Sequence, residues 1–149
     1  MKYDLDELDR GIIKHLSNDG RLSFTELSIR LQVTEKTIRL RYKSLIDKKI
    51  FEVVGVVNPV AVGLKAGAII QVKVKAKSFS KVIEKLKEIR EIRFITLVSG
   101  EYPILFQVSV KDQERITEIL QEVNKIEWIT ETNTIIQLEV YKNTFEYNF

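Results

Sequence analysis

Residues 23–45 read SFTELSIRLQVTEKTIRLRYKSL, and this stretch decides the fold of the amino-terminal part of the chain. Ser23 and Glu26 have the spacing of a capping box, so a helix of about two turns is expected to begin here. Thr34 is placed to cap a second helix. One face of that helix is apolar, with Ile38, Tyr42 and Leu45. Residues 32–34 leave room only for a tight turn, which is typical of a helix-turn-helix.

A further helix is predicted before this pair. Its apolar stripe consists of Leu5, Leu8, Ile12 and Leu16. Aspartates lie near its amino terminus, where the helix dipole favours negative charge, and Gly20 is expected to end it. The first part of the chain is therefore predicted to be a three-helix domain.

The pattern changes after residue 50. Residues 50–57 are rich in β-branched side chains and predict a strand that stops at Pro59, because proline has no N–H to donate. Residues 70–77 alternate strictly between apolar and polar side chains, which predicts another strand. Helical spacing follows at 79–89, strands at 94–98 and 104–110, a helix at 116–123 and a last strand region at 128–141.

An internal repeat supports this order of elements. Residues 88–96 (EIREIRFIT) align without gaps to residues 122–130 (EVNKIEWIT), and each copy joins the end of a helix to the start of a strand. Two such halves form a ferredoxin-like sandwich, with four antiparallel strands under two helices. The predicted fold class is α+β: an amino-terminal helix-turn-helix (winged-helix-like) domain at 1–58, a connector at 59–65, and a carboxy-terminal βαββαβ ferredoxin-like sandwich domain at 66–149.

The amino-acid composition argues against several classes of function. The 149 residues include one His and no Cys. This argues against thiolate zinc sites, other metal centres and Ser-His triads, so we expect no catalytic residue, no metal and no cofactor. No apolar run is long enough to span a membrane, and the amino terminus is acidic, unlike a secretory signal. A cytoplasmic protein without membrane contact is expected.

Positive charge is concentrated in the helix-turn-helix. Residues 30–49 hold seven basic and two acidic side chains, whereas residues 50–149 hold 13 of each. A basic cluster on the second helix of a helix-turn-helix predicts DNA binding, although a solvated helix face is the alternative for any lysine-rich stretch. The expected DNA-contacting residues are Ser23, Thr34, Glu35, Lys36, Thr37, Arg39, Arg41 and Lys43.

The roles expected for these residues follow from how such helices dock. The amino-terminal part of the helix usually reads base edges, and the candidates there are Glu35, Lys36, Thr37 and Arg39. Arg41 and Lys43 are expected to hold phosphates. Ser23 offers a backbone N–H and a hydroxyl for a further phosphate contact.

The chain resembles the Lrp/AsnC family of prokaryotic transcriptional regulators over nearly its whole length. The resemblance rests on Leu5-Asp6, Asp9, Ile12-Ile13, Leu16, residues 18–23 (NDGRLS), Glu26-Leu27, Thr34, Ile38, Arg41 and Leu45. Ile50 and Gly63-Leu64 stand where the family has the strand linking its two domains. The resemblance implies a regulator that binds pseudo-palindromic double-stranded DNA as a dimer or as a larger homo-oligomer, commonly an octamer, and that responds to an amino-acid-like effector.

The resemblance also implies where an effector would bind. In the family, the loop between the second and third strands of the effector domain lies at the ligand pocket and usually reads Gly-x-aromatic-Asp. Here Pro103 stands in place of the acidic residue that would pair with a ligand ammonium. Either Glu101 substitutes for it, or the response is altered or absent. The implied effector residues are Ser99, Gly100, Glu101, Tyr102, Thr130, Glu131, Thr132 and Thr134; for the last four, the alternative is ordinary polar residues on a strand.

Two other functions share the pattern. Siroheme decarboxylases resemble the family in both domains but depend on His residues near the substrate, and the single His15 lies in the first predicted helix, which argues against this enzyme activity. A DNA-compacting protein would use the same basic helix without sequence preference, so only its specificity ratio would distinguish it from a regulator.

Overall fold

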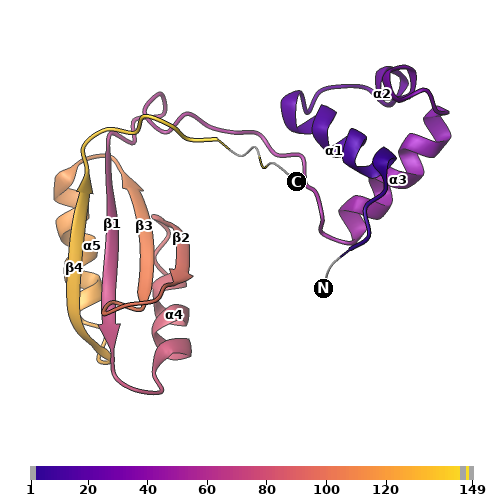
Figure 1. Ribbon diagram of the computed structural model, residues 1–149. Coiled ribbons are helices and arrows are strands. Elements are labelled where there is room, and N and C mark those ends of the chain that lie inside the picture. The colour runs from indigo at the N-terminus through magenta and orange to yellow at the C-terminus, as the bar shows by residue number, and fades with distance from the viewer. Residues whose placement is uncertain (1–2, 145–146, 148–149) are drawn as a thin grey trace. The chain divides into compact units, whose positions relative to one another are not determined.

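The computed structural model describes residues 3–144 and 147, and the chain divides into two compact units. The first unit contains the described residues up to Val56 together with those after Lys142, and the second runs from Val57 to Lys142 (Figure 1). Among the described residues, no helix has both the length and the apolar character needed to cross a lipid bilayer.

Three helices build the first unit: α1 (Glu7–Asn18), α2 (Phe24–Leu31) and α3 (Glu35–Asp47). The predicted caps are present. The Ser23 hydroxyl accepts the N–H of Glu26 while the Glu26 carboxylate accepts the N–H of Ser23, and the Thr34 hydroxyl accepts the N–H of Thr37. The buried core consists of Ile12, Ile13, Leu16, Leu27, Ile38 and Leu45. The predicted three-helix arrangement is therefore confirmed.

The turn between α2 and α3 is as tight as the sequence predicts. Gln32 ends α2 in the left-handed conformation with φ 54°, and the N–H of Val33 donates to the carbonyl of Ser28 at 3.1 Å. This bond satisfies a carbonyl that the helix end would otherwise leave open. The chain therefore reverses within a few residues, which fixes where α3 begins.

The prediction of a strand at 50–57 is wrong. The described residues have no strand there, and the segment carries no sheet hydrogen bond. Val54 and Val56 are 70% and 68% exposed. A β-branched run becomes a strand only when a second strand pairs with it, and the described part of the chain offers none to this segment.

The second unit has the predicted ferredoxin-like fold. Its elements are β1 (Ala66–Val74), α4 (Phe79–Lys87), β2 (Ile92–Leu97), β3 (Ile104–Val110), α5 (Gln113–Asn124) and β4 (Ile129–Gln137). All strand pairs are antiparallel, in the order β2-β3-β1-β4. Both helices cover the same face of the sheet, where Ile70, Phe106 and Val82 are fully buried (Figure 1).

The other face of the sheet carries a ladder of polar and apolar pairs. The side-chain amide of Asn133 on β4 donates to Gln71 on β1, and that of Gln107 on β3 donates to Gln137 on β4, both at 2.9 Å. Between these pairs, Ile69 of β1 lies opposite Ile135 of β4. No described element covers this face within the unit, because both helices pack on the opposite side.

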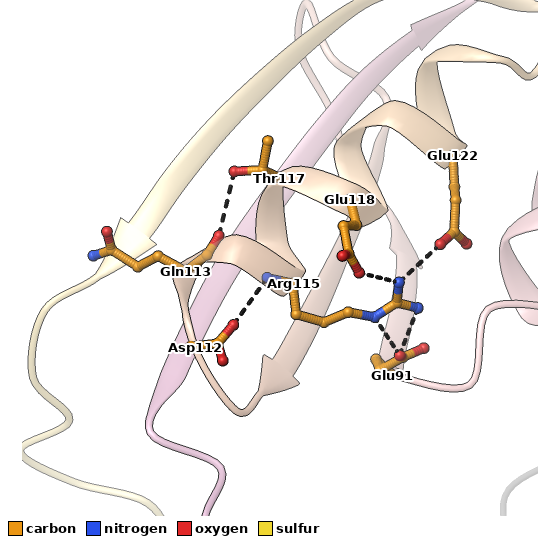
Figure 2. A network of polar contacts seen from close by, with 7 residues as sticks. All are labelled: Glu91, Asp112, Gln113, Arg115, Thr117, Glu118 and Glu122. Atoms are coloured by element: carbon orange, nitrogen blue, oxygen red, sulfur yellow. Dashed lines mark hydrogen bonds and ion pairs between the residues drawn. The ribbon is translucent and has the colours of Figure 1, made fainter.

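Arg115 ties α5 to the start of β2 (Figure 2). Its guanidinium donates to Glu91, just before β2, at 2.7 Å, and to Glu118 and Glu122 on its own helix at 2.8 and 3.0 Å. Burial is the largest single influence on Glu91 and raises its pKa, but the bond from Arg115, a backbone hydrogen bond and the charges of Arg115 and Arg90 together outweigh burial, so the pKa of Glu91 is lowered. This network holds the edge of the sheet against the helix layer.

Candidate nucleic-acid interface

The solvent-facing side of α3 presents two lysines with a leucine between them. Lys36, Leu40 and Lys43 are spaced by four and three residues, so they lie along one face of the helix. All three are exposed, and Leu40 is 62% exposed. Neither lysine lies within ion-pair distance of a carboxylate in the part of the chain that the structure describes. We call these three residues the outer face of α3.

Arg39 is oriented by α2. Its guanidinium pairs with Glu35 at 2.7 Å and lies 4.9 Å from the centre of the Phe24 ring. The Thr25 hydroxyl donates to Glu35 at 2.9 Å, and this bond, followed by the one from Arg39, lowers the pKa of Glu35. Glu35 therefore joins α2 to the first turn of α3 and holds Arg39 beside the outer face.

Three hydroxyls predicted to contact DNA also serve the helix caps. The Ser23 hydroxyl donates to the Glu26 carboxylate at 2.8 Å and accepts the Glu26 N–H at 3.1 Å. The Thr34 and Thr37 hydroxyls lie 2.9 Å apart at the start of α3. These residues set the ends of the helices, so a contact with DNA would be an additional use of the same groups.

Arg41 binds α1 within the unit. Its guanidinium pairs with Asp6 at 2.7 Å and Asp9 at 3.2 Å, and the Asp9 side chain is only 11% exposed. The pKa of Asp6 is lowered, first by the backbone N–H of Asp9 and also by Arg41. The structure thus uses Arg41 as a tie between α3 and α1, whereas the sequence suggested a phosphate contact.

The loop between β2 and β3 lies beside the ends of β1 and β4. Lys73 of β1 donates to Glu101 of the loop at 2.6 Å and to Glu131 of β4 at 2.9 Å, and its ammonium lies 4.8 Å from the centre of the Tyr102 ring. Gly100 adopts φ 115°, a conformation that favours glycine. We call Lys73, Glu101, Tyr102 and Glu131 the ammonium cage.

The charges of the ammonium cage stabilise one another. Bonds to Glu101 and then to Glu131 raise the pKa of Lys73, and the bond from Lys73 lowers the pKa of Glu131. The Tyr102 hydroxyl adds a contact of 3.3 Å to Glu131. Sequence reasoning did not identify Lys73; the only available signal was its place as a polar residue in the alternating strand.

The predicted effector residues do not all come together. Glu101, Tyr102 and Glu131 meet at the cage, but Thr132 and Thr134 lie opposite the buried Val72 and Ile70, on the helix-covered face. Thr132 donates to Asn124 of α5 at 3.0 Å. Successive strand residues face opposite sides of a sheet, so one pocket on one face cannot collect the whole run. Ser99 and Gly100 are exposed in the loop, and Thr130 is exposed beside the register shift of β4.

Comparisons with known proteins match both units. A family model for the AsnC-type helix-turn-helix domain matches residues 5–46, and one for the Lrp/AsnC ligand binding domain matches residues 67–147. The transcriptional regulator FL11 of Pyrococcus furiosus is 35% identical over 147 residues, which cover 98% of this chain and 97% of that protein.

Solved structures have the same fold. The structure of Escherichia coli AsnC superposes with a TM-score of 0.89 at 26% identity and covers 95% of this chain and 97% of its own. A transcriptional regulator of Neisseria meningitidis, solved as a complex with L-methionine, gives a TM-score of 0.89 at 22% identity with 97% of each chain covered. At that identity the second match shows the fold alone.

Proposed function

This chain is a DNA-binding transcriptional regulator of the Lrp/AsnC family, and we propose that it recognises specific operators through α3. The observation that carries this proposal is the outer face, where two exposed lysines have no described carboxylate partner on the second helix of a helix-turn-helix. Cations without internal partners are available to phosphates and base edges. Lys36 and Arg39 are the base-reading candidates, and Lys43 is the phosphate contact.

We further propose that the protein acts as a homodimer or a larger homo-oligomer. Two surfaces support this: the uncovered face of the sheet, with Ile69 and Ile135, and residues 52–57, which are exposed and have the composition of a strand but pair with no described strand. A twofold dimer would place two α3 helices in successive major grooves, about 34 Å apart. The operator would then be a pseudo-palindrome.

We propose that any control by a small-molecule effector is weak in this protein. The Neisseria relative was solved with L-methionine, so an amino acid is the natural candidate class. In this chain the carboxylates of the ammonium cage already hold the ammonium of Lys73. A ligand ammonium would have to displace a tethered one, so we expect any amino-acid response at this cage to be weak. We propose no enzymatic activity for the chain.

The experiment that tests DNA recognition is binding of the purified full chain to fragments of its own genome, followed by sequencing of the bound pool. A regulator enriches a small set of fragments that share a two-part motif, and the gene's own promoter is the first fragment to examine. Uniform recovery of all fragments at physiological salt would contradict the proposal.

A further inference from the structure

Leu40 lies on the solvent-facing side of α3, away from the hydrophobic core. The core side of α3 is formed by Ile38 and Leu45, which are 0% and 2% exposed, whereas Leu40 is 62% exposed. Two residues after Ile38, its side chain points about 200° around the helix from that core residue. The three-helix core therefore gives no reason for an apolar residue here.

The surroundings of Leu40 are cationic. Lys36 lies one turn before it and Lys43 nearly one turn after it on the same face, and Arg39 is its neighbour in sequence. An apolar side chain inside such a patch gains free energy only if a partner covers it. The adjacent positive charges favour a polyanionic partner over an ordinary protein surface.

Double-stranded DNA has one apolar feature that suits this position. In the major groove, thymine presents a C5-methyl group, while the other base edges present hydrogen-bond donors and acceptors. Leu40 is the sixth residue of α3, still in the amino-terminal half that enters a groove in helix-turn-helix proteins. Its branched aliphatic end can bury a methyl group while the flanking lysines engage phosphates or polar base edges.

We propose that Leu40 is a specificity-determining residue that packs on the C5-methyl group of a thymine in each half-site. This inference rests on the proposed recognition of operators by α3. It adds an apolar contact with a base to the polar base contacts proposed for Lys36 and Arg39.

The test is to replace each thymine of a selected operator by uracil, which removes only the methyl group. Affinities are measured with the purified full chain. We expect one thymine per half-site to be sensitive, with a loss of about fourfold when it becomes uracil, as for one buried methyl-sized group. Leu40→Ala should bind the thymine and uracil duplexes equally.

The matched control is Ile29→Ala, which removes an aliphatic side chain that is 72% exposed on α2. It should keep the full sensitivity to uracil. Both substitutions are on the surface, so folding is checked simply by circular dichroism. Sedimentation of Leu40→Ala should show the wild-type mass; a changed mass would assign Leu40 to a contact between copies and overturn the proposal.

Two further outcomes distinguish failure of this inference from failure of the proposed function. If the wild type binds its operator selectively but no uracil substitution matters, or if Leu40→Ala keeps the sensitivity, the role of Leu40 is overturned while operator recognition stands. If no duplex is preferred by the wild type, operator recognition itself fails, and the role of Leu40 fails with it.

Discussion

The outer face of α3 and the ammonium cage of the second unit use lysine in opposite ways. Lys36 and Lys43 are exposed and meet no described carboxylate, whereas the side chain of Lys73 is only 22% exposed and contacts two carboxylates and an aromatic ring. Lysine therefore points to solvent in the first unit, whereas in the second unit it forms ion pairs within the protein. The difference indicates which region needs an external partner.

The basic residues of α3 also differ in whether they form ion pairs within the protein. Arg41 is bound to α1 through Asp6 and Asp9, and Arg39 is bound to Glu35, although its guanidinium keeps donors to spare. The charge counted along the sequence therefore overstates the charge offered to DNA. Lys36 and Lys43 are the cations whose removal should cost binding without costing stability.

The largest expected effect concerns the number of α3 helices engaged. We expect the full chain to lose about 10²-fold to 10⁴-fold in affinity when one half-site of its operator is scrambled, because linked contacts raise the effective concentration of the second helix. Titration of the two duplexes by fluorescence anisotropy measures this. A loss below threefold would mean that one α3 acts alone.

Substitutions on and beside the outer face should separate base reading from phosphate binding. Lys36→Ala and Arg39→Ala are each expected to cost about 1 to 3 kcal/mol on the operator and to relax base preference. Lys43→Ala should weaken all duplexes alike and reduce the salt slope by about one unit. Equal losses on specific and random DNA for all three variants would contradict these roles.

Arg41→Ala should affect stability instead of the salt slope. It leaves the nearly buried Asp9 without its cation, and we expect a loss of about 1 kcal/mol in the free energy of unfolding. Thermal denaturation of Arg41→Ala is compared with that of Lys43→Ala, which should match the wild type. If Arg41→Ala melts normally but lowers the salt slope by one unit, Arg41 holds a phosphate after all.

Emptying the ammonium cage should create a site that the wild type lacks. Lys73→Ala removes the tethered ammonium, so methylammonium at ten times its dissociation constant is expected to stabilise that variant by about 1.4 kcal/mol. Thermal shift assays should detect this, while the wild type should respond neither to methylammonium nor to any of the twenty amino acids at millimolar concentration. The double variant Lys73→Ala/Glu101→Gln is the control and should lose the response. A wild-type response that is lost in Glu101→Gln would show that the cage of the wild type binds the ligand, and would contradict its being filled by Lys73.

The smallest effect is a pH dependence of the cage. The pKa of Glu131 is lowered in the folded protein from its usual 4.5, so its pairing with Lys73 stabilises the fold above about pH 4.5 and is lost as the pH falls through the folded value. Glu131→Gln should melt below the wild type at pH 6, and the two curves should approach each other as the pH falls below 4.5. A difference that stays constant between pH 6 and pH 3 would exclude this contribution.

Most of the fold could be predicted from the sequence because its signals are local. Capping pairs such as Ser23 with Glu26, the helical stripes and the strand alternation each lie within a few residues. The two copies of the repeat, 34 positions apart in the sequence, link the halves of the sandwich. The segment 50–57 was mispredicted because strand formation depends on a pairing partner. No pattern within the segment can supply that partner.

The sites were less accessible to sequence reasoning because they depend on contacts between distant residues. Arg41 meets Asp9 across 32 positions and Lys73 meets Glu131 across 58, and nothing in the local pattern marks either pair. Leu40 was missed for a different reason. Charge does not mark this residue, but helical spacing does, because Leu40 is apolar and out of phase with the core stripe of α3.

The central claim is that α3 selects a DNA sequence, and one ratio tests it most directly. The dissociation constant of the full chain is measured at about 150 mM salt for its selected operator and for a scrambled duplex of the same composition. A regulator of this kind should prefer its operator by about 10³-fold or more. A ratio near one would contradict the account and would support a protein that coats DNA without regard to sequence.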